Sequence, residues 1–441
     1  MNRCILTSAV LIALLTTSAK AQWREATIDL FSGSGPYATC YNPQNNKFYV
    51  ADEAGDSVTV VDGASNQVIT TLPGGVNPYD FCYNPVNNFI YCCNANSDSV
   101  TLIDGNQVVG NVNVGGGTKA LCFNSVSDKV YCSRYRDNEV AVIDGVTNHV
   151  VANVPVGSYP GMLSYNPTNN SIYCTNEHGG DVSVINGDSN KVITTVLVSD
   201  SIVNGICYNS HDNEVYCADP PNNIVAVIHC ASNQVTAYLP VGRLPRNLCY
   251  NPHGNSVYVS NQNGNSVSVI DCATHQVVST VSVGSGPWGL FWEPANDKVY
   301  CAIRSSDSVA VIDGVTDSLI KTIKVDSGPV FFAYDSAQNR VYVTNQSGNS
   351  VSVLRDSAPT AVAESKVSAT FRAGIRVVSN PARHGIALYS DADVSIRVFD
   401  PEGRVVMRQA ATKGLNLLPV PKAGAYFVKA GAQTARVVVT D

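Results

Sequence analysis

Residues 248–283 read LCYNPHGNSVYVSNQNGNSVSVIDCATHQVVSTVSV, a pattern that determines the architecture of most of the chain. Short runs rich in β-branched residues over 248–250, 256–260, 266–271 and 276–283 are separated by turns rich in Asn, Gly and Pro. Runs of this length, bounded by such residues, indicate strands joined by tight turns. The stretch therefore predicts a unit of four short antiparallel strands.

This unit recurs eight times along the chain, with a period of about 42 residues. Each copy has an aromatic residue followed by a turn, at Tyr41, Tyr83, Phe123, Tyr165, Tyr208, Tyr250, Trp292 and Tyr334. Four strands in each unit of this length are typical of a β-propeller blade. The sequence therefore predicts an all-β protein with an eight-bladed β-propeller, or a seven-bladed one as the alternative.

The ends of the array predict how the ring closes. Residues 26–36 (ATIDLFSGSGP) match the fourth-strand segment 277–287 (VVSTVSVGSGP). The eighth unit loses its fourth-strand pattern after Leu354. The N-terminal strand can therefore complete the last blade, which removes a sheet edge that would otherwise be exposed.

A tetrapeptide in the eighth unit, Tyr342-Val343-Thr344-Asn345, resembles the motif of the YVTN β-propeller repeat family, surface-layer type. Variants of it occur at 258–261 (YVSN) and 173–176 (YCTN), and the resemblance covers about residues 26–355. Members of that family are mostly secreted or surface-layer propellers. The resemblance therefore implies an exported propeller and no particular activity.

The two ends of the chain predict export. Arg3, the apolar run 5–15 and the cleavage pattern Ala19-Lys20-Ala21 are typical of a signal peptide over 1–21. The apolar run is too short to span a membrane, and no later stretch is apolar enough to do so. We expect the propeller over 22–355, a linker over 356–368 and a small antiparallel β-sandwich over 369–441.

The C-terminal part resembles the type A, Por-type sorting domain of type IX secretion cargo. The resemblance rests on the segments 379–381 (SNP), 398–406 (VFDPEGRVV), 424–428 (GAYFV) and 436–439 (RVVV), although Ala382 and Arg383 depart from the usual Asn-Pro-Phe. It implies delivery by the type IX secretion machinery and a secreted or outer-membrane surface location in a Gram-negative-type bacterium. An ordinary accessory sandwich domain is the alternative.

Charge is unevenly distributed along the chain. The net charge is −7, yet the tail from Ala361 onward is basic, so the propeller itself is strongly acidic. An acidic surface repels phosphate backbones, and we therefore do not expect nucleic acid as a partner. We expect an unidentified protein or glycan at the cell surface.

The predicted binding residues lie where the fourth-to-first and second-to-third connections share one face of a propeller, around its channel. These positions vary from unit to unit while the strands repeat, and aromatic residues and arginine are favoured at recognition sites. They are Tyr37, Tyr79, Lys119, Arg134, Arg136, Arg243, Arg246, Trp288 and Arg304. The alternative is that the aromatic side chains plug the loops and the arginines are simply solvated.

The sequence contains none of the common catalytic motifs: no glycine-rich phosphate loop, Gly-x-Ser-x-Gly, His-Glu-x-x-His or Cys-x-x-Cys-His. We therefore predict no catalytic residues, no metal site and no cofactor, and favour a non-enzymatic binding scaffold. The alternative is a propeller enzyme of the lactonase or quinoprotein type. Its nearest candidate residues are Glu177, His178 and Asp219.

The cysteines follow the repeat and allow two interpretations. Valine replaces them in some units, which indicates small buried sites where free thiols pack well. However, three units carry two cysteines in the first hairpin, and export would place them in an oxidising compartment. If the hairpin turned so that these residues faced each other, three disulfides could form, as Cys82–Cys92, Cys122–Cys132 and Cys207–Cys217.

Overall fold

The computed structural model describes residues 22–355 continuously and, beyond them, the strand residues 375–377, 382–383, 386–390, 394–399, 405–411, 414–418, 424–430 and 433–440. The chain divides into two compact units, Met1–Ala358 and Pro359–Asp441. The expected signal peptide (1–21) and linker (356–368) lie outside the described residues.

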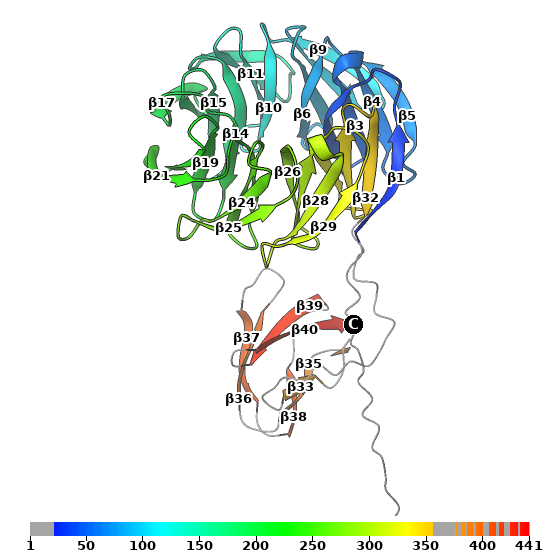
Figure 1. The fold of residues 1–441 in the computed structure, drawn as a ribbon, viewed down its shortest axis with the longest axis vertical. Helices are drawn as coiled ribbons and strands as arrows, with labels where there is room; N and C mark the ends of the chain where they lie inside the picture. Colours follow the sequence, from blue (N-terminus) through cyan, green and yellow to red (C-terminus); the bar gives the residue numbers. More distant parts are fainter. Residues whose placement is uncertain are drawn as a thin grey trace, which may run out of the picture. The chain divides into compact units, whose positions relative to one another are not determined.

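The first unit is a propeller of eight four-stranded antiparallel sheets (Figure 1). Blade 1 contains β2 (Pro36–Asn42), β3 (Lys47–Asp52), β4 (Ser57–Asp62) and β5 (Val68–Pro73), in that order. Short 3₁₀ turns follow β3 (Glu53–Gly55) and β27 (Arg304–Ser306). The prediction of eight blades is confirmed.

Six more blades repeat the order of blade 1 from the centre outward. They are blade 2, with β6 (Pro78–Asn84), β7 (Phe89–Asn94), β8 (Ser99–Asp104) and β9 (Gln107–Asn113); blade 3, with β10 (Thr118–Asn124), β11 (Lys129–Arg134), β12 (Glu139–Asp144) and β13 (Val150–Pro155); blade 4, with β14 (Pro160–Asn166), β15 (Ser171–Asn176), β16 (Asp181–Asn186) and β17 (Lys191–Leu197); blade 5, with β18 (Ile206–Asn209), β19 (Glu214–Asp219), β20 (Ile224–His229) and β21 (Gln234–Pro240); blade 6, with β22 (Pro245–Asn251), β23 (Ser256–Asn261), β24 (Ser266–Asp271) and β25 (Gln276–Ser282); and blade 7, with β26 (Pro287–Glu293), β27 (Lys298–Ile303), β28 (Ser308–Asp313) and β29 (Leu319–Lys324).

Blade 8 is closed by the N-terminal strand, as predicted. It contains β30 (Pro329–Asp335), β31 (Arg340–Asn345), β32 (Ser350–Arg355) and, as its outermost strand, β1 (Trp23–Asp29), which pairs antiparallel with β32. The closure also has an ionic clasp, in which Glu25 Oε1 accepts from Arg340 at 2.8 Å and Glu25 Oε2 accepts from Arg355 at 2.9 Å. These contacts join residues more than 300 positions apart in the sequence.

The core lies between neighbouring blades. Each second strand carries one fully buried tyrosine, such as Tyr49 in β3 and Tyr131 in β11. Its ring packs between sheets, while its hydroxyl donates to the turn between the third and fourth strands of the next blade: Tyr49 to the Gly105 carbonyl at 2.9 Å and Tyr131 to Asn190 at 2.9 Å. A buried tyrosine needs such a partner for its hydroxyl, so the repeat fixes both the packing and the position of the turns.

The first hairpin of each blade corrects one expectation. In blade 2, Asn84 pairs with Phe89, so the turn contains four residues and Cys82 lies opposite Tyr91, while Cys92 lies opposite Phe81. Adjacent positions on a strand point to opposite faces. Cys82 therefore packs between blades 2 and 3, and Cys92 between blades 1 and 2.

The hairpin disulfides Cys82–Cys92, Cys122–Cys132 and Cys207–Cys217 are therefore wrong, because the same one-residue offset occurs in all three hairpins. All thirteen cysteines in the described part of the chain are free thiols, and most are buried. Burial in apolar surroundings raises their pKa; that of Cys40 rises to about 12.

The described residues of the second unit form eight strands in two sheets. β33 (Ile375–Val377), β35 (Ile386–Ser390) and β38 (Gly414–Leu418) form a three-stranded antiparallel sheet. The other sheet has the order β34 (Ala382–Arg383), β40 (Gln433–Thr440), β39 (Gly424–Ala430), β36 (Val394–Phe399) and β37 (Val405–Ala411), and only its β34–β40 pair is parallel. No helix in the described residues is long and apolar enough to cross a membrane.

Candidate binding pocket at the centre of the propeller

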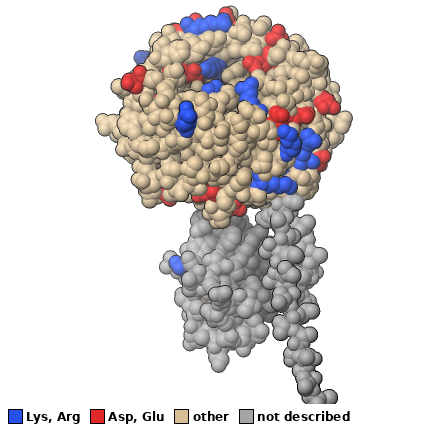
Figure 2. Space-filling view, in the orientation of Figure 1, with Lys and Arg blue, Asp and Glu red and all other residues tan. Residues whose placement is uncertain are grey.

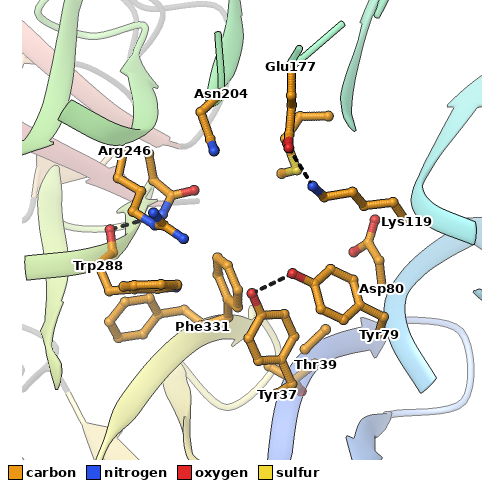
Figure 3. A pocket seen from close by; sticks show the side chains of 14 residues that line it. Tyr37, Thr39, Tyr79, Asp80, Lys119, Glu177, Asn204, Arg246, Trp288 and Phe331 are labelled. Carbon is orange, nitrogen blue, oxygen red and sulfur yellow. Dashed lines mark hydrogen bonds and ion pairs between the residues drawn. The ribbon is translucent and has the colours of Figure 1, made fainter. Parts of the chain in front are cut away.

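The innermost strands of the blades form the wall of a central pocket. Each first strand contacts the first strand of the next blade, and β30 contacts β2, so these strands form a closed ring. A pocket of about 290 Å³ lies inside this ring, and every blade contributes at least one side chain to it (Figure 3). Most of these side chains belong to the second, third or fourth residue of an innermost strand.

One side of the pocket is aromatic. Tyr37 and Tyr79 stack with 4.5 Å between ring centroids, and Phe331 meets Tyr37 edge-on at 5.1 Å. The two tyrosine hydroxyls are hydrogen-bonded to each other at 2.9 Å (Figure 3). Burial raises the pKa of both tyrosines, so their hydroxyls stay protonated at physiological pH. This side therefore presents flat, uncharged surface.

An arginine lies against the neighbouring tryptophan. The guanidinium carbon of Arg246 is 4.1 Å from the ring centroid of Trp288, and that of Arg304 is 4.8 Å from it. Arg304 also donates to Gln346 Oε1 at 2.5 Å. Arg246 has no hydrogen-bonded or ion-paired side-chain partner among the described residues. Its contact with the electron-rich ring holds the guanidinium in place without neutralising its charge.

The opposite side of the pocket carries an ion pair. Lys119 Nζ lies 2.7 Å from Glu177 Oε2, and both side chains are largely buried. Glu177 can lie there because residue 161 is a glycine: a Cβ atom at Gly161 would come within 2.5 Å of Glu177 Oε1. The charge of Lys119 is therefore satisfied inside the protein.

The remaining polar lining residues are one carboxylate, one threonine (Thr39) and two amides. Asp80 Oδ2 accepts the backbone N–H of Leu121 at 2.9 Å, and burial raises the pKa of Asp80 to about 6. Asn247 donates to the Trp288 carbonyl at 3.3 Å, and Asn204 lies beside β18. The pocket thus combines an aromatic wall, one arginine without a side-chain partner and a carboxylate that titrates near pH 6.

The structure brings five of the nine predicted binding residues together in this pocket: Tyr37, Tyr79, Lys119, Arg246 and Trp288. Arg304 joins them indirectly, through its contact with Trp288. The other three arginines lie elsewhere. Arg243 lines a separate, polar hollow of about 380 Å³ with Gln262 and Asn263.

Arg134 and Arg136 do not fit their predicted place at the mouth of the channel. Arg134 is buried, where it pairs with Glu139 and donates to the Val114 carbonyl. A buried arginine requires such partners, so Arg134 is a structural residue. Arg136 is exposed, donates to Asn96 at 2.9 Å and lies over the ring of Tyr135.

The residues suggested for an enzyme do not gather. Glu177 lines the pocket, but His178 stacks on Tyr159 with 4.2 Å between centroids, and Asp219 accepts hydrogen bonds from Asn222. In the described residues, no three His, Cys, Asp or Glu side chains are grouped as metal ligands would be.

Sequence reasoning missed the lining residues Thr39, Asp80, Met162, Asn204, Asn247, Phe331 and Phe332. Four of them, Asp80, Met162, Asn247 and Phe331, lie two residues after the residue that begins the innermost strand. At this position blades 1, 3 and 7 have Ala38, Ala120 and Gly289, so a large or charged residue there was the signal that could have identified these four. Asn204 lies just before an unusually short first strand, β18, which hides the alignment.

The fold and the pocket together define a β-propeller repeat protein with a central cavity. Residues 8–292 match the YNCE-like beta-propeller family, and the chain belongs to that family. Among solved structures the chain is similar to hydrazine synthase of Kuenenia stuttgartiensis, with a TM-score of 0.54 and 19% identity, over 74% of this chain and 97% of that chain. Similarity at this level of identity concerns the fold alone. No curated protein matches the chain.

Proposed function

We propose that this protein is an exported or cell-surface β-propeller that binds a ligand in its central pocket and acts as a non-enzymatic binding scaffold. The observation that carries the proposal is the set of pocket side chains. The strands repeat from blade to blade, whereas the pocket contains tyrosine, lysine, asparagine, arginine, tryptophan and phenylalanine at equivalent or adjacent positions. Among them, Arg246 has a charge that no described carboxylate satisfies.

The contacts inside the pocket favour binding over catalysis. The hydroxyls of Tyr37 and Tyr79 are bonded to each other, and the raised pKa of each disfavours the anion that a nucleophile would need. Lys119 and Glu177 are bonded to each other, so neither is free to exchange protons with a ligand without breaking the pair. These groups are arranged as fixed contact surfaces.

The export part of the proposal rests on sequence features. The signal-like segment 1–21 and the sorting-like tail support delivery by the type IX secretion machinery to the surface of a Gram-negative-type cell. The partner would then be a protein or glycan met outside the cell. The same propeller can serve either, since the pocket opens at the centre of the ring.

The test is an array of cell-surface glycans, glycan fragments and sugar lactones, probed with the full chain. Asn204→Trp places a large side chain in the pocket, and Asn263→Trp places the same side chain in the separate polar hollow as a matched control. We expect binding that Asn204→Trp abolishes and Asn263→Trp preserves, with the ligand recovered chemically unchanged. Opening of a lactone, or binding that Asn204→Trp leaves intact, would contradict the proposal.

A further inference from the structure

We infer that the central pocket recognises a six-membered ring bearing one carboxylate, with the carboxylate held by Arg246 and the ring face against Tyr37 and Tyr79. This inference rests on the proposed function and specifies the class of its ligand.

The first argument is the charge of the pocket. Two cations line it, and only Lys119 has a carboxylate partner, at 2.7 Å. Arg246 packs against the ring of Trp288 and has no hydrogen-bonded or ion-paired side-chain partner among the described residues. A guanidinium offers a fork of N–H donors that matches both oxygens of a carboxylate. In Figure 3 the guanidinium end of Arg246 points into the pocket.

The acidic lining residues limit the charge of the anion. Asp80 and Glu177 line the same pocket, and Asp80 has no basic partner among the described residues. A dianion such as a phosphate monoester would meet repulsion from Asp80 and would have only one available cation. A monoanion meets one cation and less repulsion. The balance of charge therefore favours a single carboxylate over phosphate or sulfate esters.

The aromatic wall and the volume define the rest of the ligand. Tyr37, Tyr79 and Phe331 line the pocket with aromatic surface, which suits an aromatic ring or the C–H face of a sugar. The volume of the pocket is about 290 Å³. One substituted ring fits this space.

Two sources supply this chemistry, aromatic carboxylates and uronic acids. The amides of Asn204 and Asn247 line the pocket and can bond ring hydroxyls, which uronic acids carry and an unsubstituted aromatic carboxylate lacks. Their contribution decides between the two sources, whereas Arg246 and the aromatic wall serve both.

The experiment is calorimetric titration of the full chain with matched charged and neutral ligands. The aromatic arm compares benzoate with benzamide, and the sugar arm compares galacturonate with methyl galactoside. We expect at least one acid to bind about tenfold or more tightly than its neutral partner. Arg246→Gln should weaken that acid about 10- to 100-fold, the usual effect of losing a charged hydrogen bond.

The matched control is Arg243→Gln, which removes the same charge three residues away, in the other hollow. It should leave the affinity unchanged, and circular dichroism should show that both variants fold. Equal binding of acid and amide, an unaffected Arg246→Gln, an equal loss in both variants, or no binding of any acid would each overturn the inference. The proposed function fails separately, only if Asn204→Trp leaves array binding intact or if the array ligand is transformed.

Discussion

Asp52 provides a stringent test of how the repeat governs stability. It ends β3 at the position where blades 2, 4, 6 and 8 carry Asn94, Asn176, Asn261 and Asn345. Those asparagines donate to side chains of the next strand; Asn345, for example, donates to Ser350 and Ser352 at 3.0 Å.

Asp52 accepts hydrogen bonds from the next strand, where those asparagines donate them. Its Oδ2 accepts from Ser57 at 3.3 Å and from Thr59 at 2.7 Å, while its Oδ1 has no partner. The side chain is fully buried, and burial raises the pKa of Asp52 from 3.8 to about 7. The folded state therefore holds this proton more tightly than the unfolded state.

The raised pKa predicts a dependence of stability on pH. Below pH 3.8 the carboxyl is protonated in both states, and it has no electrostatic effect on folding. As the pH rises from 3.8 to about 7, the unfolded state loses the proton first, and the folded state becomes progressively less stable. Above pH 7 the raised pKa therefore lowers the free energy of unfolding by at most about 4 kcal/mol, which is three pKa units at about 1.36 kcal/mol each.

Asp52→Asn should therefore stabilise the protein at pH 8 by about 2 to 4 kcal/mol and have little effect near pH 4. Urea unfolding at pH 4, 6 and 8 measures the difference. Asp219→Asn is the matched control in blade 5, because Asp219 accepts N–H groups from the Asn222 backbone and side chain. A stabilisation that is absent at pH 8, independent of pH, or shared by Asp219→Asn would refute the reasoning.

Three further predictions follow from the clasp, the pocket and the thiols. Glu25→Gln should destabilise the propeller by about 1 to 2 kcal/mol at pH 7, because the hydrogen bond with Arg340 lowers the pKa of Glu25 to about 2. In urea unfolding, the difference in stability between the variant and the native protein should shrink as the pH falls from 4.5 towards 2. A difference that stays constant with pH would contradict this prediction. The affinity of the pocket for a ring carboxylate should fall about fivefold as the pH rises from 5 to 8, because Asp80 ionises beside Lys119, Glu177 and Arg246. The affinity of Asp80→Asn should not change over that pH range. An equal fall of affinity in the variant would exclude Asp80 as the cause. Cys92→Val, which introduces the residue that blade 6 has at the equivalent Val259, should change the free energy of unfolding by less than about 1 kcal/mol. Dithiothreitol should leave the melting temperature of the native protein unchanged. A lower melting temperature after reduction would show a disulfide.

The fold could be predicted because each level of the sequence repeats. The period predicts the length of a blade, and the turn residues predict where its strands begin and end. The match between 26–36 and 277–287 predicts that β1 closes the last blade. The register within a hairpin could not be predicted in the same way. Whether Cys82 faces Cys92 or Tyr91 depends on one residue in the turn, and that residue moves a side chain to the opposite face of the sheet.

The candidate site could be predicted in part, for a related reason. The residue type varies at one repeated position, which is occupied by Tyr37, Tyr79, Lys119, Arg246 and Trp288. The symmetry of the propeller brings that position to the centre in every blade. Arg134 misled because its charge is satisfied by Glu139, a partner on the neighbouring strand that only the three-dimensional pairing reveals. Most of the exposed face in Figure 2 carries neither basic nor acidic side chains, so charge alone would not locate the pocket.

The most direct test of the central pocket as the binding site uses its tryptophan. Only Trp288 of the three tryptophans lines the pocket; Trp292 donates its indole N–H to Asp297 at 2.9 Å, and Trp23 lies in β1. In nitrogen-15 spectra the indole signal absent from Trp288→Phe is that of Trp288. Titration with benzoate or galacturonate should shift this signal and leave those of Trp23 and Trp292 in place. Saturable binding that leaves the Trp288 signal unmoved would contradict the account.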